Sequence, residues 1–435
     1  MCIACDKHMK IRRAYQTSFV EIFTAILVLL LLSYPTPGEC AGDNFFHKIS
    51  SSELLKKGEF EKAIEQLQDE LNLFPYLDNV RNNLATAYAA LGKRQLEQKK
   101  FDDAAENFDR AMKLYPEKQG LAIMKGIALY SGKRLDEATI VLEQALNKSE
   151  DNAVILHYLG RIHYDTGNLP GAIDALGKAL ILDPENKGIA ELLDRARRQL
   201  PAESRMKKEI GAKFIISYDE GSQSDIADEV LEVLDTAYNR VGSDLFHYPV
   251  AAIPVILYTR QEYRIATDSP EWSGGQYDGK IRLPIGGMSK INPMLRRVLI
   301  HEYTHVVVGE LSKNNCPGWL NEGLAEVEGR KEFDSPLAAL ETAVRDSALL
   351  PFSGMERSWT SVAAKSIVLA YQQSYSIAKF MVSNYGWHKV REILVNLGDG
   401  MSIDNSIAKA LSDYGLDYRQ IIQAWQEQIS KEYQK

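Results

Sequence analysis

The first half of the sequence repeats itself with a fixed period, and this feature constrains the fold more than any other. Small residues recur at spacings of 41, 34 and 34, and a large apolar residue follows each of them four positions later. The small residues are Ala63, Ala104, Ala138 and Ala172, and the large ones are Leu67, Phe108, Leu142 and Leu176. A 34-residue period of this kind is typical of helical pairs that stack, because each pair buries its apolar face only against its neighbours.

These units resemble the tetratricopeptide repeat, and Leu159–Gly160 matches the signature of its first helix. Three of the units are closed by a proline, at Pro75, Pro116 and Pro184. The resemblance implies an all-α superhelix over residues 44–200 that ends in a capping helix, and such arrays bind a protein partner or serve as spacers. The spacing of 41 contains seven residues more than the period, about two helical turns. We expect them to lengthen a helix between Asn79 and Gln98.

Composition indicates an ordinary globular protein of more than one domain. The chain has 435 residues, of which 45% are hydrophobic and 25% are charged. Its formal net charge is −8, and nucleic acid is therefore excluded as a partner, since phosphate binding needs a basic surface.

Residues 1–42 have the pattern of a secretory signal peptide or an N-terminal anchor. Basic residues precede an apolar run from Ile22 to Leu32, which prolines then interrupt. We expect an exported protein of the periplasm or cell envelope, held at a membrane only if residues 22–34 are retained. Cleavage would leave Cys316 as the one cysteine of the mature chain, so no internal disulfide can stabilise the fold.

From residue 210 to residue 435 the pattern predicts an α+β domain, with a small mixed sheet followed by a helical lobe. Lys213–Tyr218 and Pro254–Tyr258 are short runs rich in β-branched and aromatic residues, typical of buried strands. Gln276–Ile285 predicts a strand or a hairpin interrupted at Asp278–Gly279. Helices are expected at 224–241, 294–311, 336–348, 362–384, 389–397 and 418–432.

One of these helices carries a metal-ligand pattern. His301 and His305 lie four residues apart, so both imidazoles project from one face of the helix and can reach one ion. Glu302 follows the first histidine and is placed to take a proton from metal-bound water. The pattern predicts a zinc site with Glu302 as the general base.

A second motif, Pro317-Gly318-Trp319-Leu320-Asn321-Glu322-Gly323, follows at short distance. Together the two motifs resemble the gluzincin metallopeptidases, and among them the peptidase MA-like family, which is often joined to tetratricopeptide repeats. The resemblance implies that Glu322 is the third ligand of one zinc ion per chain. It also implies that Glu326, one turn later, binds a zinc histidine as an outer carboxylate.

The resemblance has further consequences for the site. Related enzymes use a tyrosine from the later helical lobe to stabilise the oxyanion, and Tyr375 is predicted in this role, with Tyr371 as the alternative. An edge strand beside the zinc pairs with the peptide substrate, and Lys280–Ile285 is the candidate. Gly287–Lys290 lacks the acidic residue that anchors a substrate amine in aminopeptidases, so an aminopeptidase is not implied.

The sequence therefore predicts a zinc metallopeptidase that cleaves a peptide or protein substrate, with repeats that bind a partner or the substrate. The first alternative is a catalytically inactive interaction protein, in which zinc only stabilises a degenerate peptidase domain. The second is a metallohydrolase that acts on something other than a peptide.

Overall fold

The computed structural model describes residues 50–148, 151–269, 274–286, 288, 290–356 and 366–433. These residues form two compact units, one ending at Arg197 and the other beginning at Arg198. The predicted signal or anchor segment, residues 1–42, lies outside the described residues. Within the described ranges, no helix combines the length and the apolar character needed to cross a membrane.

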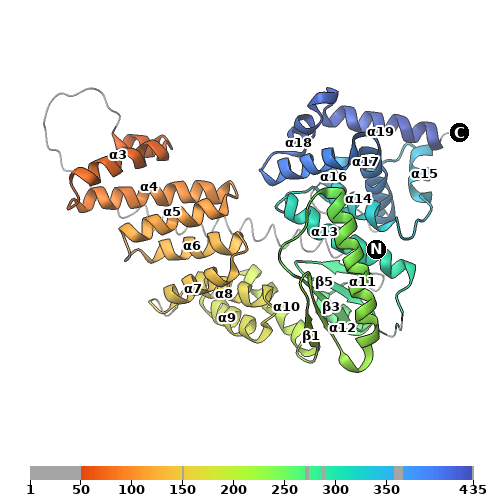
Figure 1. Ribbon diagram of the computed structural model, residues 1–435, viewed down its shortest axis with the longest axis horizontal. Helices are drawn as coiled ribbons and strands as arrows, with labels where there is room; N and C mark the ends of the chain where they lie inside the picture. The colour runs from red at the N-terminus through yellow and green to blue at the C-terminus, as the bar shows by residue number, and fades with distance from the viewer. Residues whose placement is uncertain are drawn as a thin grey trace. The chain divides into compact units, whose positions relative to one another are not determined.

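The first unit consists of helices alone in its described part, coloured orange to yellow in Figure 1. From α2 to α9 each helix packs on the next one, as a stack of helical pairs requires. In sequence order they are α2 (Ser51–Lys56), α3 (Phe60–Leu73), α4 (Asp78–Glu97), α5 (Phe101–Leu114), α6 (Gln119–Ser131), α7 (Leu135–Leu146), α8 (Ala153–Asp165), α9 (Leu169–Leu182) and α10 (Lys187–Glu203). Helix α10 continues through Pro201, so that the division between the units falls inside this helix.

Close contact between the two helices of a pair explains the repeated large apolar residues. Three glycines lie 34 residues apart on α4, α6 and α8, at Gly92, Gly126 and Gly160. A Cβ atom at these positions would lie 3.2, 2.5 and 2.6 Å from the large apolar residue of the next helix. Those residues are Phe108, Leu142 and Leu176, all buried. The glycine of the first helix in each pair therefore leaves room for the large residue of the second helix.

The long spacing in the repeat is accommodated in α4, as the sequence predicted. Helix α4 has 20 residues, whereas α6 and α8 have 13 each. Gly92 is the fifteenth residue of α4, while Gly126 and Gly160 are each the eighth residue of their helix. The seven additional residues therefore lie at the N-terminal end of α4, and Val80 and Leu84 among them are buried.

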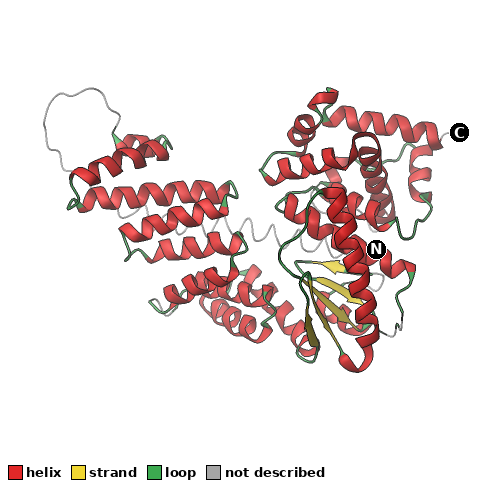
Figure 2. Cartoon of the chain, in the orientation of Figure 1, coloured by secondary structure: helices red, strands yellow, loops and turns green. Residues whose placement is uncertain are grey.

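The second unit begins with a mixed sheet of five strands, in the order β1-β2-β3-β5-β4 (Figure 2). Strands β2, β3 and β5 run parallel, while β1 and β4 are antiparallel to their neighbours at the two edges. The strands are β1 (Lys207–Ile210), β2 (Phe214–Tyr218), β3 (Ile253–Tyr258), β4 (Gln276–Tyr277) and β5 (Ile281–Pro284), and the helices between them are α11 (Glu220–Leu245) and α12 (Arg260–Thr267).

The prediction that Lys280–Ile285 forms the edge strand is wrong. The chain turns at Gly279, where φ is 98°, and β4 folds back along the outer side of β5. Strand β5 therefore lies between β3 and β4. Pro284 is tolerated because it is the last residue of β5.

The two faces of the sheet pack against different helices because side chains alternate along each strand. Val255 and Leu257 of β3 belong to the main core of this unit, together with residues of α11 and α13. Ile256 and Tyr258 point to the opposite face, where they pack with α12 and with Ala202 of α10. The last turn of α10 is thus part of the second unit.

A helical lobe completes the second unit, and in Figure 1 helices α13 and α14 lie between the sheet and this lobe. The helices that follow the sheet are α13 (Pro293–Leu311), α14 (Gly318–Gly329), α15 (Ala338–Arg345), α16 (Phe352–Met355), α17 (Ile367–Gly398), α18 (Ile403–Ala410) and α19 (Tyr418–Tyr433), with a 3₁₀ turn at Ser412–Tyr414. Gly386, with φ 79°, interrupts the helical conformation of α17 between the two helices that the sequence predicted.

We expect Gly160→Ala to destabilise the repeat unit, because the new Cβ would lie 2.6 Å from Cγ of Leu176. Overpacking of this kind typically lowers the free energy of unfolding by ~1–3 kcal/mol. Gly177→Ala on α9 is the matched control: nothing lies within 4 Å of its Cβ position, so the same change should stabilise the helix by ~0.5–1 kcal/mol. Denaturant unfolding followed by far-ultraviolet circular dichroism measures both. Equal midpoints for the two variants would contradict this packing.

Candidate metal centre and active site

The helix that carries the predicted ligands, α13, is fixed at its start by local signals. Oδ1 of Asn292 accepts a hydrogen bond from the backbone amide of Leu295 at 2.8 Å. Pro293 occupies the first turn of the helix, where no amide donor is needed. Every residue from Val298 to Val308 is buried. Histidine and glutamate at such positions are expensive to bury without a partner, and their presence therefore calls for an explanation.

The three predicted metal ligands come together from two helices. Oε2 of Glu322 on α14 lies 3.3 Å from Nε2 of His301 and 3.7 Å from Nε2 of His305. One ligand atom from each residue lies within 4.8 Å of the others, and all three side chains are buried. Two atoms bound at 2.0–2.1 Å to a tetrahedral zinc ion are about 3.3–3.4 Å apart. The spacing therefore fits one zinc ion.

The polar atoms at this point have no hydrogen-bond partner in the described part of the chain. They are Nε2 of His301, Nε2 of His305, Oε2 of Glu322 and both carboxylate oxygens of Glu302. Buried polar groups are nearly always hydrogen-bonded, and such a cluster is explained by ligands that the protein binds. Two imidazoles and one carboxylate are the donor set of a catalytic zinc. The residues present fit this metal.

Glu326 lies where an outer carboxylate would bind a metal-ligating histidine. Its Oε1 lies 3.3 Å from Nδ1 of His301, whereas Oε2 of Glu322 faces the other ring nitrogen, Nε2. Burial raises the pKa of Glu326, but the neighbouring His301, Arg297 and Arg330 outweigh burial and hold this pKa below its usual range. The carboxylate is therefore ionised and can accept a hydrogen bond from Nδ1–H of His301. This leaves Nε2 of His301 for the metal.

The same carboxylates act on His301 in the metal-free protein. Burial lowers the pKa of His301, but the carboxylates of Glu322 and Glu326 outweigh it and raise the pKa to about 10. A proton therefore competes with a metal ion for Nε2 of His301.

Three residues of the site were missed by the sequence analysis. Oδ1 of Asn321 lies 3.0 Å from Nδ1 of His305, and thus orients the second histidine as Glu326 orients the first. Arg297 and Arg330 both bind Glu326. A local signal existed for each of the arginines, because Arg297 lies one turn before His301 and Arg330 lies one turn after Glu326.

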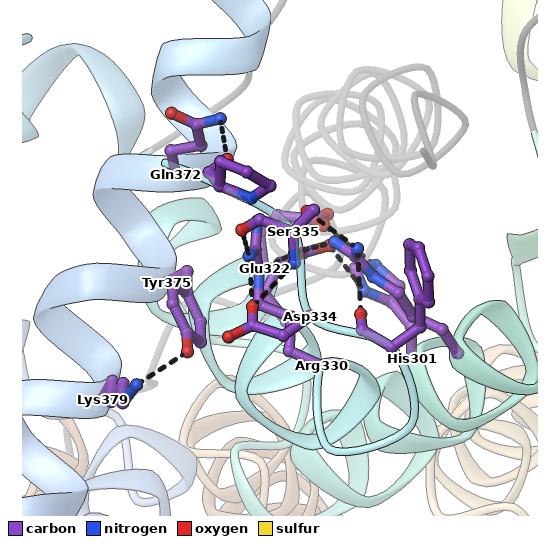
Figure 3. A network of polar contacts seen from close by, with 12 residues as sticks. His301, Glu322, Arg330, Asp334, Ser335, Gln372, Tyr375 and Lys379 are labelled. Carbon is purple, nitrogen blue, oxygen red and sulfur yellow. Dashed lines mark hydrogen bonds and ion pairs between the residues drawn. The ribbon is translucent and has the colours of Figure 1, made fainter. Parts of the chain in front are cut away.

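The two tyrosines considered for the oxyanion differ in their surroundings. The Tyr371 ring is buried and its centroid lies 6.5 Å from that of His301. Tyr375 accepts a hydrogen bond from Nζ of Lys379 at 3.0 Å, and its ring faces the guanidinium of Arg330 at 4.4 Å. Figure 3 shows Tyr375 and Lys379 together on α17. Tyr371 is therefore the tyrosine that lies next to a metal ligand.

The edge of the sheet approaches Glu302 through a glycine. A Cβ atom at Gly275, directly before β4, would lie 3.0 Å from Oε1 of Glu302 and 2.9 Å from Cγ1 of Val298. Helix α13 also contacts β4 itself. Gly275 thus lets the backbone beside the edge strand pass close to the predicted general base.

Comparison with known proteins agrees with this division. Residues 251–431 match the model of the Peptidase MA superfamily, and residues 89–153 and 153–186 match models of the tetratricopeptide repeat. No curated protein matches the chain.

Several solved structures are similar to part of the chain. MamA from Desulfovibrio magneticus RS-1, residues 41 to the end, is 25% identical over 34% of this chain and 79% of its own, with a TM-score of 0.28. YrrB, described as a TPR protein with an unusual peptide-binding site, is 21% identical over 35% of this chain and 84% of its own, with a TM-score of 0.26. Yeast Tom70 is 12% identical over 80% and 69%, with a TM-score of 0.28.

These scores are too low to support an argument about fold or function, so the family models carry the assignment. The chain carries tetratricopeptide repeats followed by a domain of the Peptidase MA superfamily at residues 251–431.

Proposed function

We propose that this chain is a zinc-dependent peptidase with a single zinc site formed by His301, His305 and Glu322. One observation carries the proposal: these buried residues converge with one ligand atom each within 4.8 Å, and Nε2 of both histidines and Oε2 of Glu322 have no hydrogen-bond partner among the described residues. When bound, zinc would polarise a substrate carbonyl and lower the pKa of water, so that hydrolysis can proceed at neutral pH.

Glu302 is the proposed general base. Both of its carboxylate oxygens are buried and have no hydrogen-bond partner among the described residues, so either can hold a proton and pass it on. The side chain follows His301 directly on α13 and is 0% exposed. Glycine at position 275 leaves room for this carboxylate, because a Cβ atom there would lie 3.0 Å from Oε1 of Glu302.

The outer edge of the sheet at β4 is the proposed binding surface for an extended peptide. Among the described strands β4 is the outermost on this side of the sheet, and α13 lies next to it. A peptide that adds a strand at this edge would run past Gly275 and therefore past Glu302. This arrangement favours a peptide substrate over a small molecule, because main-chain groups of the edge strand recognise main-chain groups of the substrate.

The oxyanion donor is proposed to be Tyr371, since its ring lies beside His301. Tyr375 remains the prediction from the sequence, and its hydroxyl oxygen accepts the hydrogen bond from Lys379. The repeats support protein–protein interaction, and we propose that they recruit a partner or the substrate itself. We propose further that the protein works in the cell envelope, which rests on the sequence of residues 1–42 alone.

We expect the purified full-length chain to hold one zinc ion. His305→Ala should lose most of the metal, because it removes one of three ligands. His388→Ala is the control, since this histidine lies after the break in α17 and outside the three-residue cluster. Elemental analysis measures both. Protein purified without chelator that holds no zinc, and takes up none when zinc is added, would refute the site.

We expect Glu302→Gln to fold, to keep its zinc and to lose peptide hydrolysis. Glutamine has nearly the shape of glutamate but cannot accept a proton at neutral pH, and general bases typically contribute ~10²–10⁴-fold to the rate. Turnover of a diverse peptide mixture, with and without chelator, measures the effect. Retained activity would show that the assigned base is wrong. A wild type with zinc but without chelator-sensitive turnover would favour an interaction protein, or a hydrolase of other substrates.

Substitution of the two tyrosines tests the oxyanion assignment. Loss of one oxyanion donor typically lowers kcat by about 10²–10³, so we expect Tyr371→Phe to be slow with its zinc content unchanged. Tyr375→Phe, one turn away on the same helix, is the matched control and should retain most of the activity. The opposite ranking would assign the role to Tyr375, as the sequence predicted.

A further inference from the structure

Two arginines hold the carboxylate that orients His301. Nη2 of Arg297 donates to Oε2 of Glu326 at 2.6 Å, and Nε of Arg330 donates to the same oxygen at 2.9 Å. Arg297 comes from α13 and Arg330 from the end of α14. The other oxygen, Oε1, faces Nδ1 of His301 at 3.3 Å. The two oxygens of one carboxylate therefore have separate tasks.

This division fixes both the position and the rotation of Glu326. Two charge-assisted hydrogen bonds to one oxygen, from different helices, leave the carboxylate a single orientation. In that orientation the second oxygen can only point at the imidazole. All three side chains are well buried, with side-chain exposures of 5% for Glu326, 5% for Arg330 and 13% for Arg297, so water does not replace these bonds.

We infer that Arg297 and Arg330 are positioning residues of the metal site, which act through Glu326 to hold His301 in the geometry that binds zinc. The inference rests on the metal site proposed above. Arg330 also donates through Nη1 to Oδ1 of Asp334 at 2.8 Å and to the carbonyl of Ser335 at 2.7 Å, which anchors the guanidinium from its far side (Figure 3).

The test measures the zinc affinity of the full-length chain by competition with a chromophoric chelator. Outer-shell substitutions typically weaken metal binding about 10–100-fold, and we expect this loss for Arg330→Gln and Arg297→Gln. Other ion pairs of the second unit provide matched controls, because Arg296 pairs with Glu332 and the exposed Arg345 with Glu341. Arg296→Gln and Arg345→Gln should stay within about twofold of the wild type, as expected for partly exposed pairs.

A double-mutant cycle separates positioning from general damage. In a Glu326→Gln background the arginines have no carboxylate to hold, so adding Arg330→Gln should change the zinc affinity by less than about twofold. The visible spectrum of the cobalt(II)-substituted protein should shift in both single variants and match the wild type in the controls. If Arg330→Gln does not fold, Arg330→Lys and the more exposed Arg297→Gln carry the test.

Wild-type affinity and spectrum in both arginine variants would overturn the inference. An equal loss of affinity in the Glu326→Gln background would overturn it too, since the arginines would then act without that carboxylate. A wild-type chain that binds no zinc would instead refute the proposed metal site. Zinc lost in His305→Ala but retained in the arginine variants would leave the site intact and remove only the role of the arginines.

Discussion

Helix α14 lies between α13 and α17 at distances that only glycine permits, and the candidate metal site depends on this packing. A Cβ atom at Gly323 would lie 2.3 Å from the carbonyl oxygen of Ser374 on α17. One at Gly329 would lie 3.0 Å from the carbonyl oxygen of Arg297 on α13. Because the helices approach so closely, the glutamates at 322 and 326 reach the histidine at 301 from a neighbouring helix.

Buried ion pairs then hold α14 in one register. Glu328, which is 0% exposed, lies 3.2 Å from Nε of Arg240 on α11 and 2.7 Å from Nζ of Lys331. Glu326, two residues earlier, binds its two arginines on the side of the metal ligands. Buried pairs of this kind add little net stability, but breaking one leaves an uncompensated charge. Their consequence here is orientation, because a slip of α14 past its neighbours would separate Glu326 from Arg297 on α13 and Glu328 from Arg240 on α11.

The repeat unit shows how far periodicity reaches. The 34-residue spacing predicted stacked helical pairs, and the seven additional residues predicted a longer helix, because both are properties of the chain itself. The structure added that these residues extend α4 at its N-terminal end. Helix α10 belongs to both units, because it continues through Pro201 to Glu203 and its last turn packs in the second unit.

The sequence by itself determined which residues form the helix of the candidate metal ligands and how its groups are spaced. His301 and His305 share a face because a helix has 3.6 residues per turn. The same geometry sets the direction of Glu302, the residue after His301. The position of Glu322 and Glu326 was implied by resemblance, but only the contact between α13 and α14 brings them to the histidines. The order of the strands, and hence the position of β4 at the edge, likewise depends on the tertiary structure, since strands do not pair in the order in which they follow along the chain. Tyr371 and Tyr375 differ by one turn, and the point at which α17 crosses the neighbouring helices decides which of them lies beside His301. Local periodicity fixes the face of a helix, whereas crossing points are fixed by the packing of side chains that lie far apart in the sequence.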